Sequence, residues 1–211
     1  ALISVPLLLR WLQLDVTTSM QAAFVLVLWV WLTGGLHLDG LADSADAWLG
    51  GFGDKQRTLD LMKDPTCGPS AVIVLVLVLL LKWLALSEVI AVIQLAPTWQ
   101  WLALVFVPVL ARFEVMLLIV HTPYVRTEGL GTELKNQAQT HWVWFWCISL
   151  ALLMLYLNLW LSLVVLTTAA IGYGLMRRLM LQRIHGWTGD TAGASIEMTE
   201  LFLLLALSMA L

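Results

Sequence analysis

Hydrophobic and polar positions fall into long blocks along this chain. The longer apolar blocks cover 20–36, 71–96, 99–120, 142–176 and 196–211, and a shorter one opens the chain at 1–14. A helix that crosses a bilayer needs about 17 to 25 predominantly apolar residues. The blocks therefore predict transmembrane helices, and block 142–176 is long enough for two of them, joined near 158–160. We expect block 1–14 to be the end of an initial span, and the natural chain to begin upstream of Ala1.

The polar segments between these blocks predict how the spans are oriented. Three are long, at 37–69, 121–141 and 177–194, and the other connections are short. If each span crosses once, the long segments share one side, and they hold eight of the eleven Lys and Arg residues. Basic residues in short loops mark the cytoplasmic side. The predicted fold class is all-α: a polytopic transmembrane bundle of about six to seven spans with short cytoplasmic helices, forming one domain over 1–211.

Composition narrows the function classes. Hydrophobic residues make up 61% of the chain and charged residues 12%, which is about half the charged share of a soluble domain. These values exclude a soluble globular domain, a disordered chain and a nucleic-acid-binding protein with a basic face. The partner that the composition predicts is the lipid bilayer. Cys67 and Cys147 form neither a CxxC pair nor a Cys/His metal motif.

The first candidate site is an acidic stripe in GGLHLDGLADSADAWLGG, residues 34–51. Asp39, Asp43 and Asp46 stand at i, i+4 and i+7, so a helix places them on one face. Three neighbouring carboxylates repel one another unless cations neutralise them, and oxygen ligands suit Mg²⁺ or Mn²⁺. The alternative is a solvated acidic face at the membrane boundary. On a regular helix His37 points away from the stripe, so it is either a base that reaches the site or an interfacial histidine.

A second stretch, DKQRTLDLMKDPTCG at 54–68, mixes acids with bases. We expect Arg57, Asp60 and Asp64 to share one helical face, with Lys63 beside it and Pro65 ending the helix. In isolation this is typical of salt bridges on a solvated helix. Beside the first stripe, it suggests two antiparallel helices that hold two divalent ions. Paired ions stabilise both the attacking and the leaving oxygens of phosphoryl transfer.

A third stretch, RIHGWTGDTAGASIEMTE at 183–200, resembles the entry to a helix that carries Glu197 and Glu200. Its residues Thr188, Gly189 and Asp190 are either a plain helix cap or a phosphate contact. Both glutamates need partners if they are buried in the membrane. Arg112 within block 99–120 is likewise either functional or paired with an acid. The glycines of the segment 128–131, EGLG, are a weak signal.

These motifs resemble a known family. GGLHLDGLADSADA at 34–47, RTLDLMKDPTCG at 57–68, EGLG at 128–131 and TGDTAGASIEMTE at 188–200 resemble, in this order, the motifs of the cobalamin synthases, the adenosylcobinamide-GDP ribazoletransferases. The resemblance extends from about Thr33 to the end. This chain has Ala47 where the family usually has Gly, Asp60 where Glu is common, and Lys63-Asp64-Pro65 where an Arg-Asp-Ser run is usual.

The resemblance implies a Mg²⁺-dependent phosphotransferase in the bacterial inner membrane, with its active face on the cytoplasmic side. Its substrates would be adenosylcobinamide-GDP and α-ribazole or α-ribazole 5′-phosphate. The ribose hydroxyl attacks the phosphorus attached to cobinamide, GMP leaves, and adenosylcobalamin or its phosphate forms. Beyond the substrates and the bilayer, the candidate partners are a second copy of the chain and other enzymes of the same pathway, and the sequence leaves the oligomeric state open.

Roles for the candidate residues follow from this implied reaction. The metal ligands would be Asp39, Asp43, Asp46, Asp60 and Asp64. Arg57, Lys63 and Arg112 would balance the remaining charge of the diphosphate, with Thr188, Gly189 and Asp190 as further substrate contacts. Either Asp64 or His37 would accept the proton of the attacking hydroxyl.

Two other functions remain as alternatives. The spacings of 43–46 and 60–64 are similar to the DxxDG and GxxxDxxxD motifs of CDP-alcohol phosphotransferases, although the glycine after the second acid is absent. We treat this similarity as an analogy of mechanism. An ion-coupled transporter would place its acids at mid-membrane depth. Most acids of this chain lie instead in the long segments predicted to share one face, which favours catalysis at the membrane surface.

Overall fold

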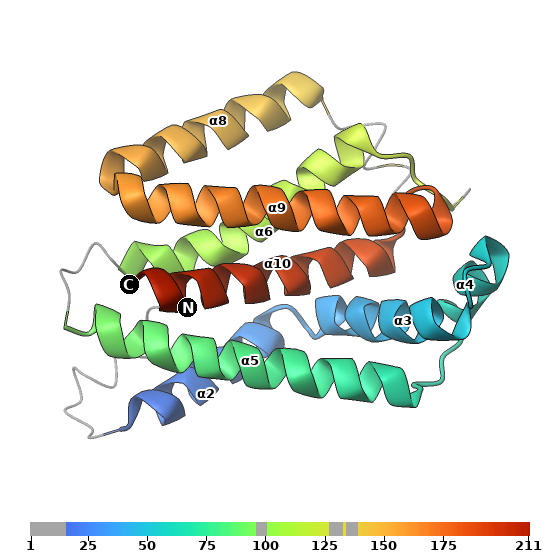
Figure 1. Ribbon diagram of the computed structural model, residues 1–211, viewed down its shortest axis with the longest axis horizontal. Coiled ribbons are helices and arrows are strands. Elements are labelled where there is room, and N and C mark those ends of the chain that lie inside the picture. Colours follow the sequence, from blue (N-terminus) through green and yellow to red (C-terminus); the bar gives the residue numbers. More distant parts are fainter. Residues whose placement is uncertain (1–15, 96–100, 127–132, 134–138) are drawn as a thin grey trace.

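The computed structural model describes residues 16–95, 101–126, 133 and 139–211 (Figure 1), and helices make up most of them. The helices are α2 (Thr18–Leu32), α3 (Leu36–Gly50), α4 (Lys55–Leu61), α5 (Pro69–Ile93), α6 (Leu102–His121), α8 (Thr140–Leu157), α9 (Leu159–Ile184) and α10 (Gly189–Ala210). The described residues contain no strand, only one isolated bridge between Tyr124 and Trp187. The all-α prediction is confirmed.

Five of these helices, α5, α6, α8, α9 and α10, are long and apolar enough to cross a membrane. Helices α2 and α3 reach this standard only as a pair, and they are bent by 86° relative to each other. Gly34 and Gly35 form the bend, with φ angles of 62° and 71°, which few residues other than glycine adopt readily. A polytopic bundle is confirmed, with five spans or six if the bent pair is one span. The expected initial span at 1–14 lies outside the described residues.

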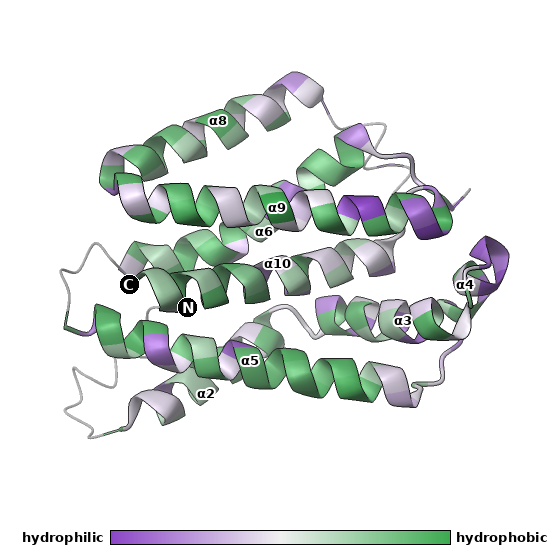
Figure 2. Cartoon of the chain, in the orientation of Figure 1, coloured by the Kyte–Doolittle hydropathy of each residue, from purple (hydrophilic) through white to green (hydrophobic). Residues whose placement is uncertain are grey.

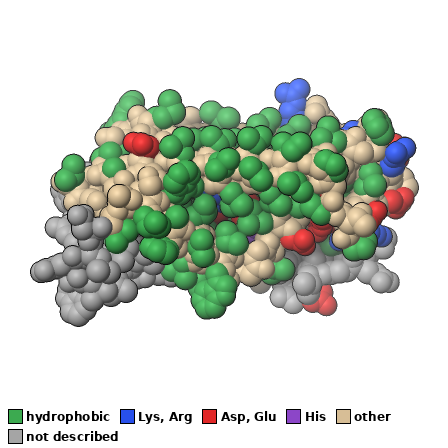
Figure 3. All heavy atoms as spheres, turned by 90° about the horizontal axis from the view of Figure 1, so that it is seen from below, with side chains coloured by type: hydrophobic (Ala, Val, Ile, Leu, Met, Phe, Trp, Pro, Cys, Tyr) green, Lys and Arg blue, Asp and Glu red, His purple; other side chains and the backbone are tan. Residues whose placement is uncertain are grey.

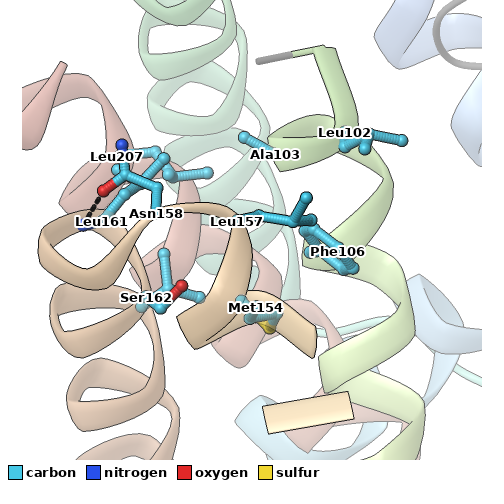
Figure 4. Close-up of a pocket in the computed structure, with 10 residues that line it drawn as sticks. Leu102, Ala103, Phe106, Met154, Leu157, Asn158, Leu161, Ser162 and Leu207 are labelled. Carbon is cyan, nitrogen blue, oxygen red and sulfur yellow. Dashed lines mark hydrogen bonds between the residues drawn. The ribbon is translucent and has the colours of Figure 1, made fainter. Parts of the chain in front are cut away.

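The split of block 142–176 into two helices is also confirmed. The break falls at Asn158, whose side chain accepts a hydrogen bond from the Leu161 N–H at 2.9 Å and so caps the start of α9. Apolar residues of α6, α8, α9 and α10 line a small pocket beside this turn, as Figure 4 shows. No charged side chain lines this pocket, so it offers nothing to hold a phosphate or a metal.

Helix α10 is the centre of the bundle. It packs against α3, α5, α6 and α9, and Figure 1 shows it between α9 on one side and α3 and α5 on the other. Its residues Leu203, Leu204 and Leu207 are fully buried in a cluster with Leu86 and Ile90 of α5. Helix α8 is peripheral, and most of its large apolar side chains are exposed. Such exposure is expected where lipid replaces water.

The long connections lie together at one end of the bundle, which we call the loop end. The ends of α3, α6 and α9 and the starts of α5, α8 and α10 all lie there (Figure 1). Figure 2 shows the most hydrophilic stretches at α4 and near the end of α9. On the face that Figure 3 draws, most of the visible charged side chains lie at the same end. The predicted common side of the three long segments is therefore confirmed.

The predicted bounds of the third polar segment, 177–194, are wrong. Helix α9 continues through 177–184, and α10 begins at Gly189, so that only 185–188 connect the two helices. The charged side chains Arg177, Arg178 and Arg183 do not end α9, because arginine is a good helix former. Polarity here marks the part of a helix that extends beyond the apolar layer.

Candidate active site

A close helix crossing brings the first and third motifs together. A Cβ atom on Gly40 of α3 would lie 2.6 Å from the carbonyl oxygen of Asp190, and one on Gly193 of α10 would lie 3.2 Å from the Cα of His37. Only glycine permits this approach at Gly40, since real Cβ atoms are not found so close to a backbone oxygen. The crossing places the acidic face of α3 beside the first turn of α10.

Two acids of the stripe line a cavity of about 300 Å³ between α3 and the segment that leads into α5. Asp39 and Asp43 form one wall, and the segment 65–67 with Leu75 of α5 forms the other. The negative charges of Asp39, Asp190 and Asp46 act on Asp43, and Arg126 is the cation that opposes them. This crowding of carboxylates around one basic side chain favours an additional bound cation.

Asp46, the third acid of the stripe, has a structural task. Its Oδ2 accepts a hydrogen bond from the N–H of Gly68 at 2.5 Å, and its Oδ1 accepts one from the N–H of Ala71 at 2.9 Å. These N–H groups belong to the start of α5, where backbone donors lack partners within the helix. Asp46 therefore fixes α5 against α3, and a role as metal ligand would compete with this cap.

The predicted common face of Arg57, Asp60 and Asp64 is wrong. Helix α4 ends at Leu61, and Asp64 lies in the loop that follows. Pro65 explains this, because a residue before proline is driven out of the helical conformation. Asp64 instead accepts hydrogen bonds from the side chain and the backbone N–H of Thr66, at 2.6 and 2.9 Å. These two bonds hold the pKa of the Asp64 carboxyl below its usual value.

The remaining residues of the second motif lie on the exposed surface of the loop end. The guanidinium group of Arg57 lies over the ring of Phe52, 5.1 Å from its centroid. Asp60 accepts a hydrogen bond from the Nε2 of Gln56 at 3.0 Å, and Lys63 is exposed. Asp64 is connected to the acidic cavity through Thr66, which lines it.

The third motif provides both a cap and an ion pair. Thr188 is buried and forms a reciprocal cap with Thr191 at the start of α10, with hydrogen bonds of 2.9 and 3.2 Å. Asp190 pairs with Arg126, 2.5 Å from Oδ2 to Nη2. The cap that the sequence offered as one interpretation of Thr188 is confirmed. Gly189 is exposed at the helix start, beside Asp190.

A second group of charges is buried inside the bundle. Nζ of Lys82 on α5 lies 2.6 Å from Oε2 of Glu197 and 2.7 Å from Oε2 of Glu200. Arg112 of α6 pairs with the other oxygen of Glu200 and donates to the carbonyl of Pro108. Nδ1 of His37 lies 4.0 Å from Oε1 of Glu197. The pairing alternative for Arg112 is thus confirmed, and we call Lys82, Arg112, Glu197 and Glu200 the buried ion network.

Oxygen donors fit a magnesium ion at the acidic cavity, although the described residues contain no preformed cage. Within the described ranges, no three His, Cys, Asp or Glu side chains converge closely enough to hold a metal by themselves. Mg²⁺ needs no such cage, since it is usually bound by one or two carboxylates together with water and substrate phosphates. Asp39 and Asp43 on the cavity wall supply that number of carboxylates.

Comparison with known proteins decides the family. The family model of cobalamin-5-phosphate synthase matches residues 1–208. The chain belongs to this family. An adenosylcobinamide-GDP ribazoletransferase of Ectopseudomonas mendocina (strain ymp) is 48% identical over 195 residues, covering 91% of this chain and 76% of the relative. One of Pseudomonas syringae pv. syringae (strain B728a) is 47% identical over 190 residues, covering 90% and 76%. No solved structure matches.

As a member of the cobalamin-5-phosphate synthase family, the protein is a transferase of cobalamin biosynthesis. Among the predicted site residues, Asp39 and Asp43 line the acidic cavity, and the charge of Asp190 acts on Asp43. Asp64 is bonded to Thr66, which lines the cavity. It does not bring Arg57 and Asp60 to that cavity's lining. The segment 128–131, part of the family resemblance, lies outside the described residues.

The sequence analysis did not predict two basic residues that the structure places beside the acids: Arg126 near the acidic cavity and Lys82 in the buried ion network. Arg126 pairs with Asp190, and its charge also acts on Asp43 of the cavity wall. Its position directly after a span gave no specific signal. Lys82 did give one, because it is the only basic residue in the apolar block 71–96. A charge inside a membrane helix marks a functional or paired position.

Proposed function

We propose that this enzyme joins adenosylcobinamide-GDP to α-ribazole, or to its 5′-phosphate, and that Mg²⁺ bound at Asp39 and Asp43 is required. The hydroxyl oxygen of the acceptor forms a bond to the phosphorus next to cobinamide, and the bond from that phosphorus to the GMP oxygen breaks. The observation that carries the proposal is the crowding of carboxylates at the acidic cavity, opposed by Arg126.

Charge explains why this cavity suits a diphosphate only when a metal is present. Asp39, Asp43 and Asp190 repel an anionic substrate, and Arg126 is already paired with Asp190. A divalent ion reverses the local sign and offers open positions to phosphate oxygens. Phosphoryl transfer needs mainly positioning and neutralisation of charge, so these residues can act without a covalent intermediate. Mn²⁺, with the same preference for oxygen ligands, should replace Mg²⁺ at least in part.

The acceptor hydroxyl must lose a proton, and Asp64 and His37 are the two candidates. The Asp64 carboxyl is ionised at neutral pH, as an aspartate of ordinary pKa is, and the hydrogen bonds from Thr66 lower its pKa further. It is joined to the wall of the acidic cavity through that same residue. His37 lies at the start of α3, where its Nδ1 is 4.0 Å from Glu197. The variants Asp64→Asn and His37→Gln are assayed separately. The residue whose variant loses turnover but still binds the substrates is the base.

The proposed location is the bacterial inner membrane, with the loop end facing the cytoplasm. Support comes from the basic residues of the segments at the loop end, among them Lys55, Arg57, Lys63 and Arg126. Excess of Lys and Arg in short loops favours the cytoplasmic side. This orientation exposes the acidic cavity to the compartment that contains nucleotides.

The test is an assay of the purified full-length protein in lipid nanodiscs with adenosylcobinamide-GDP and α-ribazole. We expect release of GMP and formation of adenosylcobalamin with Mg²⁺, and loss of both after chelation with EDTA. Asp54→Asn is the matched control for Asp→Asn variants, because an asparagine caps α4 as well as the Asp54 side chain does. Turnover that persists without divalent ions would contradict the metal proposal. Turnover with CDP-diacylglycerol in place of adenosylcobinamide-GDP would favour a lipid enzyme.

A further inference from the structure

A short backbone bridge fixes Arg126 beside the start of α10. The N–H of Val125 donates to the carbonyl oxygen of Trp187 at 3.0 Å, and the N–H of Trp187 donates to the carbonyl oxygen of Pro123 at 3.0 Å. The ring of Tyr124 packs against the ring of Trp187, with their centroids 4.7 Å apart. The backbone that leads from α6 to Arg126 is therefore held in place by the link between α9 and α10.

Asp190 holds the side chain of Arg126 next to the acidic stripe. Its Oδ2 lies 2.5 Å from Nη2 of Arg126. Its carbonyl oxygen lies so close to α3 that a Cβ atom on Gly40, between Asp39 and Asp43, would be 2.6 Å away. The charges of Asp190 and Arg126 both act on Asp43. Asp43 therefore lines the acidic cavity and also lies within reach of the charge on Arg126.

The guanidinium group of Arg126 is only partly used by this pair. The contact with Asp190 involves Nη2, and among the residues that the structure describes Nε has no acceptor. A guanidinium group has five N–H donors arranged as a planar fork. The side chain of Arg126 is 29% exposed, so a ligand from solvent can reach it. An anion can thus bind Arg126 while the pair with Asp190 stays in place.

The basic residues that the sequence predicted for the diphosphate lie elsewhere. Arg57 and Lys63 are absent from the lining of the acidic cavity, and Arg112 belongs to the buried ion network. Among the basic residues that the structure describes, only Arg126 has a charge that acts on Asp43. The task of balancing the diphosphate therefore falls to a residue that the sequence analysis did not single out.

The reaction needs such a cation in addition to a metal ion. A diphosphate that joins two groups is doubly negative, and breaking its P–O bond places further charge on the leaving oxygen. Enzymes that transfer phosphoryl groups commonly use an arginine to stabilise this charge. Arginine suits the task because its planar fork donates parallel hydrogen bonds to phosphate oxygens.

We propose that Arg126 binds the diphosphate of the donor substrate through the N–H groups that Asp190 leaves free, and that Asp190 is a positioning residue that holds Arg126 beside the acidic stripe. This inference rests on the proposed function and assigns the cation that the diphosphate requires. The bridge to the link between α9 and α10 fixes the backbone of Arg126, so the side chain need not be ordered when the substrate binds. Preorganised donors of this kind favour the transition state.

The first experiment measures how the full-length protein in nanodiscs binds GDP in the presence of Mg²⁺, by isothermal titration calorimetry. GDP carries the nucleotide and the diphosphate of the donor. Arg126→Gln should raise the Kd for GDP at least about tenfold. Arg178→Gln is the matched control, because it removes the same charge from an exposed position on α9, and it should change the Kd less than about twofold. Wild-type affinity for GDP in a folded Arg126→Gln variant overturns the inference.

The second experiment separates a binding role of Arg126 from a structural one. Asp190→Asn breaks the same ion pair, but it removes a negative charge, so the affinity for GDP should equal or exceed that of the wild type. Its kcat should fall at least about fivefold, since Arg126 is no longer held in place. If Asp190→Asn weakens GDP binding as much as Arg126→Gln does, the pair acts only as a structural unit and the inference is overturned. An unchanged kcat in Asp190→Asn overturns the positioning role.

A double variant keeps the test decisive if Arg126→Gln alone fails to fold. Arg126→Gln combined with Asp190→Asn removes one charge of each sign and leaves no unpaired carboxylate at the start of α10. We expect this double variant to bind GDP at least about tenfold more weakly than Asp190→Asn alone. Equal affinity in these two proteins overturns the inference.

Failure of the proposed function gives a different result from failure of this inference. Absence of turnover in the wild-type protein with Mg²⁺, adenosylcobinamide-GDP and α-ribazole contradicts the proposed function. Normal wild-type turnover, together with wild-type affinity for GDP in Arg126→Gln, contradicts only the role of Arg126.

Discussion

The acidic cavity and the buried ion network both concentrate charges, yet they balance them differently. In the network two carboxylates, Glu197 and Glu200, meet two cations, Lys82 and Arg112, on neighbouring helices. At the acidic cavity the charges of Asp39, Asp190 and Asp46 all act on Asp43, and Arg126 is the cation that opposes them. The first arrangement is complete by itself. The second has an excess of negative charge that a divalent ion would remove.

Location explains the contrast. The network lies within helices that cross the membrane, where a charge without a partner is too costly to persist. The network therefore joins α5, α6 and α10, and we expect a substitution in it to lower the stability of the protein. The acidic cavity lies at the loop end, where water and ions reach it, so an excess charge can await a ligand. We expect a substitution in the acidic cavity to lower the activity of a protein that still folds.

Asp43→Asn is expected to have the largest effect on activity. The amide keeps the size of the side chain but removes a charge that would hold the metal against the diphosphate. We expect kcat/KM to fall about 100- to 1,000-fold, while the variant inserts and folds like the wild type. The measurement is the GMP-release assay in nanodiscs, with thermal unfolding as the check on folding. If Asp43→Asn turns over at the wild-type rate at saturating Mg²⁺, the proposed metal site is wrong.

Lys82→Met is expected to show the opposite behaviour. It leaves Glu197 and Glu200 without the Lys82 cation, and loss of one partner from a buried pair costs about 3 to 5 kcal/mol. Purified protein should unfold at a lower temperature, and the fraction that remains folded should keep most of its kcat/KM.

A double variant tests whether the Lys82 effect is electrostatic. Lys82→Met combined with Glu197→Gln removes one charge of each sign, so part of the lost stability should return. A Lys82→Met protein of normal stability with strongly reduced turnover would instead place the network within the catalytic machinery.

The same contrast shows what the sequence can reveal. Apolar blocks predicted the spans, and the spacing of Asp39 and Asp43 predicted their common position, because both follow from the geometry of one helix. The partners of Lys82 on α10 lie 115 and 118 residues away, and no local pattern encodes such contacts. Asp46 was indistinguishable from the other acids of its stripe until α5 supplied the N–H groups that it caps.

Asp46→Asn sharpens the comparison inside the acidic stripe. An asparagine oxygen can retain one of the two hydrogen bonds to the start of α5, so the variant should lose about 1 kcal/mol of stability. If capping is the task of Asp46, kcat/KM should fall less than about tenfold, and the Mg²⁺ concentration for half-maximal rate should stay as in the wild type. A large rise in that concentration would make Asp46 a metal ligand as well as a cap.

The smallest expected effects concern the exposed bases of α4, which the acidic cavity does not include. Arg57→Ala removes a guanidinium group predicted to balance the diphosphate, and at an exposed position this should raise the KM for adenosylcobinamide-GDP about threefold. Lys55→Ala, two residues earlier on the same helix, should leave both the KM and the stability unchanged. The two variants are compared in the GMP-release assay at low and high salt. An equal effect from both would show that α4 acts only through its overall charge, since a specific contact would distinguish Arg57 from Lys55.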